Sequence, residues 1–226
     1  HQLPTSVLIL AHSMGGVAAR AAPFMRNNEP GSISAIVTLN SPHQAHPFGA
    51  EGGFNQLYIR LNKLWSDPEA WRDDGDIRGN DGIDEKAERR RIGSRIGAGK
   101  GVLSGMAIAS ITGGSRDHVV RADLSSLQGL APAGRALHVW TTALPGVWIE
   151  TDHDAIVWCG QLVAVLSRAL ISMHEKITRG RDSGYRIIAS PLDRLRAFRE
   201  SLFGRSQQHW QLPPMKPLLL PSRIAK

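Results

Sequence analysis

Four short runs of apolar residues are distributed along the chain, and stretches with helical spacing or turn residues separate them. A short apolar run bounded by turn signals is typical of a strand that is buried on both faces. Strands of this kind that alternate with helices indicate a mostly parallel sheet in an α/β fold. We therefore expect strands at residues 7–11, 33–39, 106–111 and 137–142, with helices flanking the sheet.

The first run leads directly into a serine among small residues and then into a helical stretch. Ala11, Gly15 and Gly16 leave room for a tight strand-to-helix turn that exposes the Ser13 hydroxyl, although Ala11 departs from the G-x-S-x-G pattern. In such a turn the N–H of Met14 lies at a helix N-terminus and can bind an oxyanion. The pattern predicts a nucleophile elbow with Ser13 as nucleophile and Met14 as oxyanion donor; an ordinary loop serine is the alternative.

A serine nucleophile needs a histidine base and an acid that orients the base. Asp117 follows the third apolar run in a Gly-Gly turn, and His153 follows the fourth. Both positions lie beyond the carboxyl ends of predicted strands, where α/β sheets bind their ligands. We expect Ser13, Asp117 and His153 to form the catalytic triad.

Other residues compete for two of these roles. Asp117 could instead serve as a turn former or pair with a neighbouring arginine. Asp152 adjoins His153, and neighbouring residues rarely face each other in triad geometry. His12 is next to the serine and should point away from it. The remaining candidates are Asp123 as acid, and His43 and His118 as base.

Three further segments carry weaker signals. Helical spacing over residues 54–65 predicts a helix that either covers the site or belongs to the core. Residues 67–105 are rich in Gly, Asp and Arg, and we expect a mobile, disordered insertion there. Cys159, the one cysteine, is expected to be a small buried residue within a helix. The histidines and this cysteine form no zinc pattern, so we expect no metal and no organic cofactor.

The chain has a net charge of +7 and a sequence pI of about 10.2. Residues 168–226 hold 12 Lys and Arg against 4 Asp and Glu, and within them Leu195, Phe198 and Leu202 have helical spacing. We interpret residues 175–226 as a solvated, basic, Pro-containing tail. Binding to anionic lipid or to nucleic acid is the non-enzymatic alternative, but no nucleic-acid motif is present.

Four strings together resemble the GPI inositol-deacylases, a family of lipase-like serine hydrolases of the endoplasmic reticulum. These strings are VLILAHSMGGVAAR, TLNSPHQAHP, SITGGSRDHVVRADLSSL and WIETDHDAIVWCGQLV, and the similarity covers about residues 3–170, with one insertion. The resemblance implies an α/β-hydrolase fold and the same roles for Ser13, Asp117 and His153. It also implies removal of the acyl chain from the inositol of a GPI anchor, with GPI-anchored proteins as partners. Because the chain has no nucleic-acid motif, we expect no nucleic acid among its partners.

The resemblance has consequences for domain organisation as well. An α/β-hydrolase has strands before its elbow, so we expect this chain to be a fragment that lacks the N-terminal strands. Residues 1–174 would then form the catalytic domain. Location in the endoplasmic reticulum membrane, through segments outside this chain, follows only from the resemblance. A general lipase or carboxylesterase with the same triad is the alternative enzyme.

Overall fold

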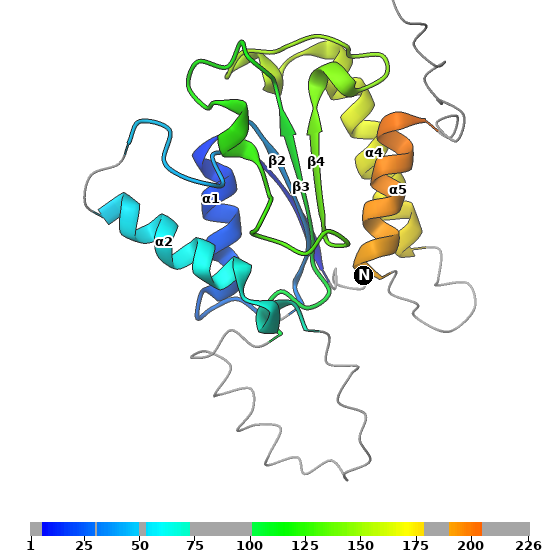
Figure 1. Cartoon of the computed structure of the whole chain (residues 1–226). Coiled ribbons are helices and arrows are strands. Elements are labelled where there is room, and N and C mark those ends of the chain that lie inside the picture. The colour runs from blue at the N-terminus through cyan, green and yellow to red at the C-terminus, as the bar shows by residue number, and fades with distance from the viewer. Residues whose placement is uncertain (1–5, 30, 50–52, 73–100, 179–189, 205–226) are drawn as a thin grey trace, which may run out of the picture.

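In the computed structural model, four parallel strands form one sheet in the spatial order β1-β2-β3-β4 (Figure 1). The structure describes residues 6–29, 31–49, 53–72, 101–178 and 190–204. The strands are β1 (Val7–His12), β2 (Ile33–Leu39), β3 (Ala107–Thr112) and β4 (Ala136–Trp140). The four predicted strands and the α/β class are therefore confirmed, and no strand end differs from its predicted position by more than two residues.

Helices cover both faces of the sheet. Helices α1 (Met14–Ala21) and α2 (Gly53–Ser66) lie on one face, and α4 (Gly160–Thr178) and α5 (Pro191–Phe203) lie on the other (Figure 1). Short 3₁₀ turns complete the fold: η1 (Ala22–Phe24), η2 (Pro68–Trp71), η4 (Ala122–Ser125), η5 (Thr141–Ala143) and η6 (Ala155–Val157). This arrangement makes a three-layer α/β/α sandwich.

The side-chain alternation of the central strands builds two separate cores. Val37 of β2 and Ala109 of β3 face α4 and α5, whereas Ile36 and Ile108 face α1 and α2. Every residue of β2 and β3 is buried. Among the described residues β1 pairs only with β2, and its Leu10 is 48% exposed.

Helix α2 is a core helix that also reaches the elbow. Its buried Tyr58, Leu61 and Trp65 belong to the core beneath α1. The Tyr58 hydroxyl lies 3.5 Å from Sδ of Met14, so the same helix touches the residue after Ser13. The core interpretation of the predicted helix therefore applies to α2, which also contacts the residue after Ser13.

The disorder expected over residues 67–105 is not found at either end of that segment, because residues 67–72 are folded and Leu103 is fully buried. Asp67 caps η2 by accepting a hydrogen bond from the N–H of Glu69, and Trp71 is buried. The indole N–H of Trp71 donates to the carbonyl of Trp65 at 2.7 Å, which ties η2 to the end of α2. Residues 73–100, where the rest of that prediction falls, lie outside the described residues.

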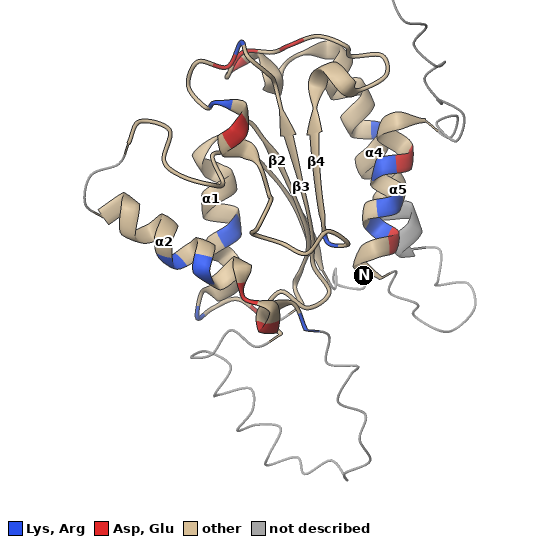
Figure 2. Cartoon of the chain, in the orientation of Figure 1, with Lys and Arg blue, Asp and Glu red and all other residues tan. Residues whose placement is uncertain are grey.

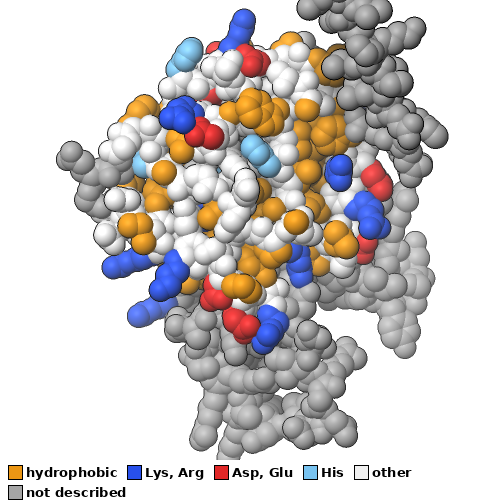
Figure 3. Space-filling model, in the orientation of Figure 1, with side chains coloured by type: hydrophobic (Ala, Val, Ile, Leu, Met, Phe, Trp, Pro, Cys, Tyr) orange, Lys and Arg blue, Asp and Glu red, His pale blue; other side chains and the backbone are white. Residues whose placement is uncertain are grey.

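Helix α5 differs from the expected solvated tail. Leu195, Phe198 and Leu202 are buried in the core against α4, and buried Arg194 donates to the carbonyl of Gly105. Apolar residues at helical spacing therefore form a packed face here, so the folded unit continues past residue 174. Figure 2 shows acidic and basic residues along α5 and further Lys and Arg on α1 and α2, and Figure 3 shows acidic and basic side chains at the surface over α5. Of the helices in the described ranges, none is long and apolar enough to span a bilayer.

Candidate active site

Ser13 occupies a sharp turn between β1 and α1. Its φ of 53° and ψ of −133° are unusual for a residue with a side chain, and such strain is characteristic of a nucleophile elbow. The Ser13 N–H donates to the carbonyl of Leu39 at 3.0 Å, which ties the turn to the end of β2. The turn therefore presents the serine at the carboxyl end of the sheet.

Glycine is required at one position of this turn. A Cβ built on Gly16 would lie 2.6 Å from Cβ of Ser41 and 3.0 Å from Cγ2 of Thr38. A Cβ on Gly15 would meet only Cβ of Ala11, at an ordinary 3.8 Å. Helix α1 can therefore approach β2 closely only because Gly16 has no side chain, whereas residue 15 has room for a methyl group.

The structure brings together the three residues predicted as a triad. His153 Nε2 lies 2.8 Å from Oγ of Ser13, and His153 Nδ1 lies 2.9 Å from Oδ2 of Asp117. An ionised carboxylate only accepts hydrogen bonds, so Nδ1 carries the proton and Nε2 accepts from the serine hydroxyl. The His153 side chain is 14% exposed and that of Asp117 is fully buried.

The loop around Asp117 fixes its carboxylate. Oδ1 accepts hydrogen bonds from the N–H groups of Val119 and Val120, at 2.9 and 2.7 Å, which leaves Oδ2 for His153. Hydrogen bonds to a carboxylate are charge-assisted and stronger than neutral ones. Asp117 is therefore a turn former and the partner of His153 at once.

The competing acids and bases are engaged elsewhere. Asp152 accepts from the N–H groups at the start of η6, and exposed Asp123 pairs with Arg121. His43 is buried, with Nε2 2.8 Å from Oγ1 of Thr38. Burial lowers the pKa of His43 well below its usual value, and Arg20 and His138 lower it further. His118 is exposed.

His12 has a role that the sequence did not suggest. Its Nε2 donates to the carbonyl of His153 at 2.8 Å, and the two rings lie 4.7 Å apart. The sequence predicts only that the His12 side chain points away from Ser13. It gives no sign of the contact with His153, the hydrogen-bond partner of Ser13.

Asn40 is a second residue that sequence reasoning missed. It is buried at the end of β2 with a φ of 44°. Its Oδ1 accepts from the N–H of Gly113 at 2.7 Å, and its Nδ2 donates to the carbonyl of Asp152 at 3.2 Å. One side chain thus connects the loop that carries Asp117 to the loop that carries His153. The string TLNSPHQ contained this residue, but only its tertiary contacts reveal the role.

Two other positions concern the chemistry. As the first residue of α1, Met14 has an N–H that the helix leaves without an internal partner, which suits an oxyanion donor.

Cys159 differs from its prediction: it is only partly buried and precedes α4 rather than lying within it. Within the described part of the chain, no three His, Cys, Asp or Glu residues are placed to hold a metal ion.

A parallel sheet that ends in a strained serine elbow, with a histidine and an aspartate aligned behind the serine, defines an α/β-hydrolase. The family comparison makes the assignment specific. The model of the PGAP1-like alpha/beta domain matches residues 1–173, and the chain belongs to this family.

Curated relatives agree with that assignment. A GPI inositol-deacylase of Eremothecium gossypii is 34% identical over 203 residues, which are 89% of this chain and 17% of the relative. Those of Debaryomyces hansenii and Kluyveromyces lactis are 37% and 34% identical, over 75% and 76% of this chain and 15% of each relative. The chain therefore spans about a sixth of the length of these relatives.

Proposed function

We propose that this chain hydrolyses carboxylic esters, with Ser13 as nucleophile, His153 as general base and Asp117 as the orienting acid. The observation that carries the proposal is the unbroken hydrogen-bond chain from Ser13 through His153 to Asp117. Nε2 of His153 is placed to take the proton of the Ser13 hydroxyl, and Oδ2 of Asp117 accepts a hydrogen bond from Nδ1 of His153. The reaction requires no metal or organic cofactor.

The geometry suits a two-step acyl transfer. The Ser13 hydroxyl attacks the ester carbonyl while Nε2 of His153 takes its proton, and buried Asp117 stabilises the imidazolium. The N–H of Met14 stabilises the oxyanion of the tetrahedral intermediate. His153 then gives its proton to the leaving alcohol, and water hydrolyses the acyl-serine by the reverse sequence. Ser13 is regenerated at the end of the cycle.

We propose the acyl chain on the inositol of a GPI anchor as the ester that is cleaved. The names of the curated relatives and the family match support this substrate. We also propose GPI-anchored proteins as the partners and, from the family resemblance of the sequence alone, the endoplasmic reticulum membrane as the place of action. A general lipase or carboxylesterase would use the same triad on other esters.

The substrate proposal is tested by comparing esters. Release of fatty acid from an inositol-acylated GPI, a triacylglycerol and a phospholipid is measured with the wild-type chain and with Ser13→Ala. We expect release from the acylated inositol to exceed the others and to disappear in Ser13→Ala. Equal rates on all three lipids would favour a general lipase, and release that survives in Ser13→Ala would refute the serine mechanism.

A further inference from the structure

Glu150 connects the loop that carries the base to the loop that carries the acid. It lies three residues before His153, and its partner Ser115 lies two residues before Asp117. The Ser115 hydroxyl lies 2.9 Å from Oε1 and 2.8 Å from Oε2 of Glu150, and the Ser115 N–H donates to Oε1 at 3.2 Å. One carboxylate therefore binds both the main chain and the side chain of a residue in the turn that leads to Asp117.

Gly114, the residue before Ser115, makes this contact possible. Its φ of 101° is one that residues with a side chain rarely adopt. A Cβ built on Gly114 would lie 3.0 Å from both Cγ and Oε1 of Glu150, so the carboxylate lies directly against the backbone of the turn. Because a glycine turn has little stiffness of its own, the contact with Glu150 restricts the segment that leads into Asp117.

The charge of Glu150 favours the contact. Hydrogen bonds from the Ser115 hydroxyl and N–H lower the pKa of Glu150 below its usual value, and Arg116 lowers it further. The carboxylate is therefore ionised at neutral pH, and hydrogen bonds to an ionised acceptor are stronger than neutral ones. Ser115 is exposed, so water screens the contact and limits its effect to a few-fold in rate.

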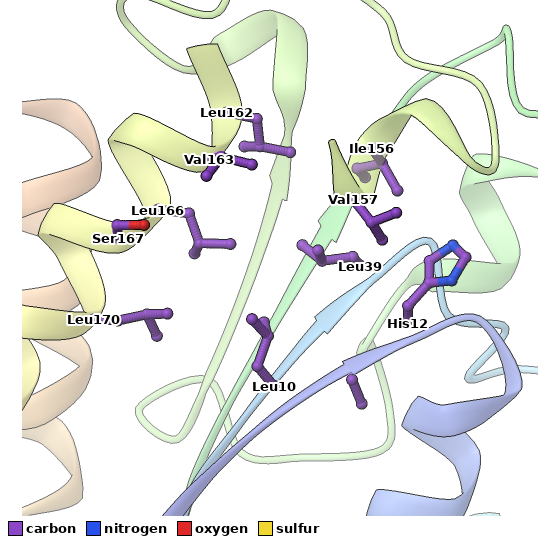
Figure 4. A pocket seen from close by; sticks show the side chains of 11 residues that line it. Leu10, His12, Leu39, Ile156, Val157, Leu162, Val163, Leu166, Ser167 and Leu170 are labelled. Carbon is purple, nitrogen blue, oxygen red and sulfur yellow. The ribbon is translucent and has the colours of Figure 1, made fainter. Parts of the chain in front are cut away.

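The other contacts of these loops hold different points. His12, at the end of β1 (Figure 4), donates to the main-chain carbonyl of His153. The N–H of Thr151 donates to the carbonyl of Gly113 at 2.9 Å, at the start of the turn. Glu150 adds a contact at the exposed tip of the turn, which neither of these hydrogen bonds reaches.

We propose that Glu150 is a positioning residue, which holds the turn so that the Asp117 carboxylate stays aligned with Nδ1 of His153. It acts on the acid through Ser115. This inference rests on the proposed function, in which Asp117 orients the base. Loss of the contact lets the acid move while the binding of the ester is unchanged, so kcat should fall and KM should stay the same.

The test compares kcat and KM for p-nitrophenyl acetate in variants of the full chain. Glu150→Ala should lower kcat about fivefold with KM unchanged. Glu150→Gln keeps an oxygen that can accept from Ser115 and should recover most of the rate. Asp154→Ala is the matched control and should have the wild-type rate, because Asp154 is an exposed carboxylate that follows His153 directly on the same loop.

A double-mutant cycle shows whether Glu150 acts through Ser115. Ser115→Ala removes the hydroxyl but keeps the N–H, so kcat should fall less than in Glu150→Ala. The double variant should be no slower than Glu150→Ala, because both substitutions break one contact. Circular dichroism checks that each variant is folded. Proton NMR follows the Nδ1–H of His153, whose signal should broaden in Glu150→Ala and stay sharp in Asp154→Ala.

Several results would overturn the proposal. A wild-type kcat in Glu150→Ala, a loss confined to KM, or a Glu150→Ala chain that does not fold would each exclude a positioning role. An equal loss in Glu150→Gln or Asp154→Ala would assign the effect to charge near His153, and additive losses in the double variant would separate Glu150 from Ser115. Ser13→Ala is measured in parallel. If it is as fast as the wild type, the proposed function fails; if it is inactive while Glu150→Ala has the wild-type rate, the positioning role alone fails.

Discussion

His12 donates a hydrogen bond from Nε2 to the main-chain carbonyl of His153 at 2.8 Å, and their ring centroids are 4.7 Å apart. A carbonyl oxygen can only accept, so His12 carries its proton on Nε2. His12, the residue before Ser13, therefore connects the nucleophile elbow to the loop that carries the base, His153.

This contact predicts a difference between two variants of His12. His12→Phe keeps a ring beside His153 but leaves the His153 carbonyl without its hydrogen-bond donor. The lost hydrogen bond should cost about 1–3 kcal/mol. We expect kcat on p-nitrophenyl acetate to fall about tenfold. His12→Gln retains an N–H donor and should recover most of the rate. Equal loss in both variants would contradict a role for the hydrogen bond.

Asn40 provides a second link between the catalytic loops. Asn40→Gly tolerates the φ of 44° but removes both hydrogen bonds, whereas Asn40→Ala adds backbone strain. We expect urea denaturation to show a loss of about 1–3 kcal/mol for Asn40→Gly and more for Asn40→Ala. Hydrolysis should fall in both. An Asn40→Gly chain with wild-type stability and rate would exclude the linking role.

The strands and the elbow could be predicted because their signals are local. Buried parallel strands produce continuous apolar runs, and the small residues around Ser13 belong to one turn. The roles of His12 and Asn40 depend on partners 141 and 73 residues away, which no local pattern specifies. The spacing of Leu195, Phe198 and Leu202 predicted an amphipathic helix but not the surface that it covers.

The close approach of α1 to β2 predicts that alanine substitutions at the adjacent Gly15 and Gly16 have different effects on stability. Gly16→Ala forces a methyl group against Ser41 and Thr38 and should lower stability by about 1–3 kcal/mol. Gly15→Ala meets only ordinary contact and should be neutral or stabilising, because alanine favours a helix. Thermal melting of both variants measures the difference. Similar melting temperatures would show that the turn tolerates a side chain at residue 16.

Buried His43 predicts how stability depends on pH. Burial lowers its pKa well below 6.5, so the unfolded chain binds more protons than the folded chain as the pH falls below that value. Stability should decrease by about 1.4 kcal/mol per pH unit below about pH 6.5. His138, whose pKa burial also lowers, adds to this slope. Urea denaturation of His43→Gln should show a weaker dependence of stability on pH. An unchanged dependence would rule out His43 as its cause.

The most direct test of the central claim is the rate at which a fluorophosphonate probe labels Ser13, followed by intact-mass and peptide mass spectrometry. We predict a single adduct on Ser13 that is absent in Ser13→Ala. Asp117→Asn should slow labelling by about 10⁴-fold, because His153 loses its correct tautomer. Asp123→Asn, which alters an exposed carboxylate on the same loop, should label at the wild-type rate. Labelling at another residue, or equal rates in Asp117→Asn and Asp123→Asn, would contradict the triad.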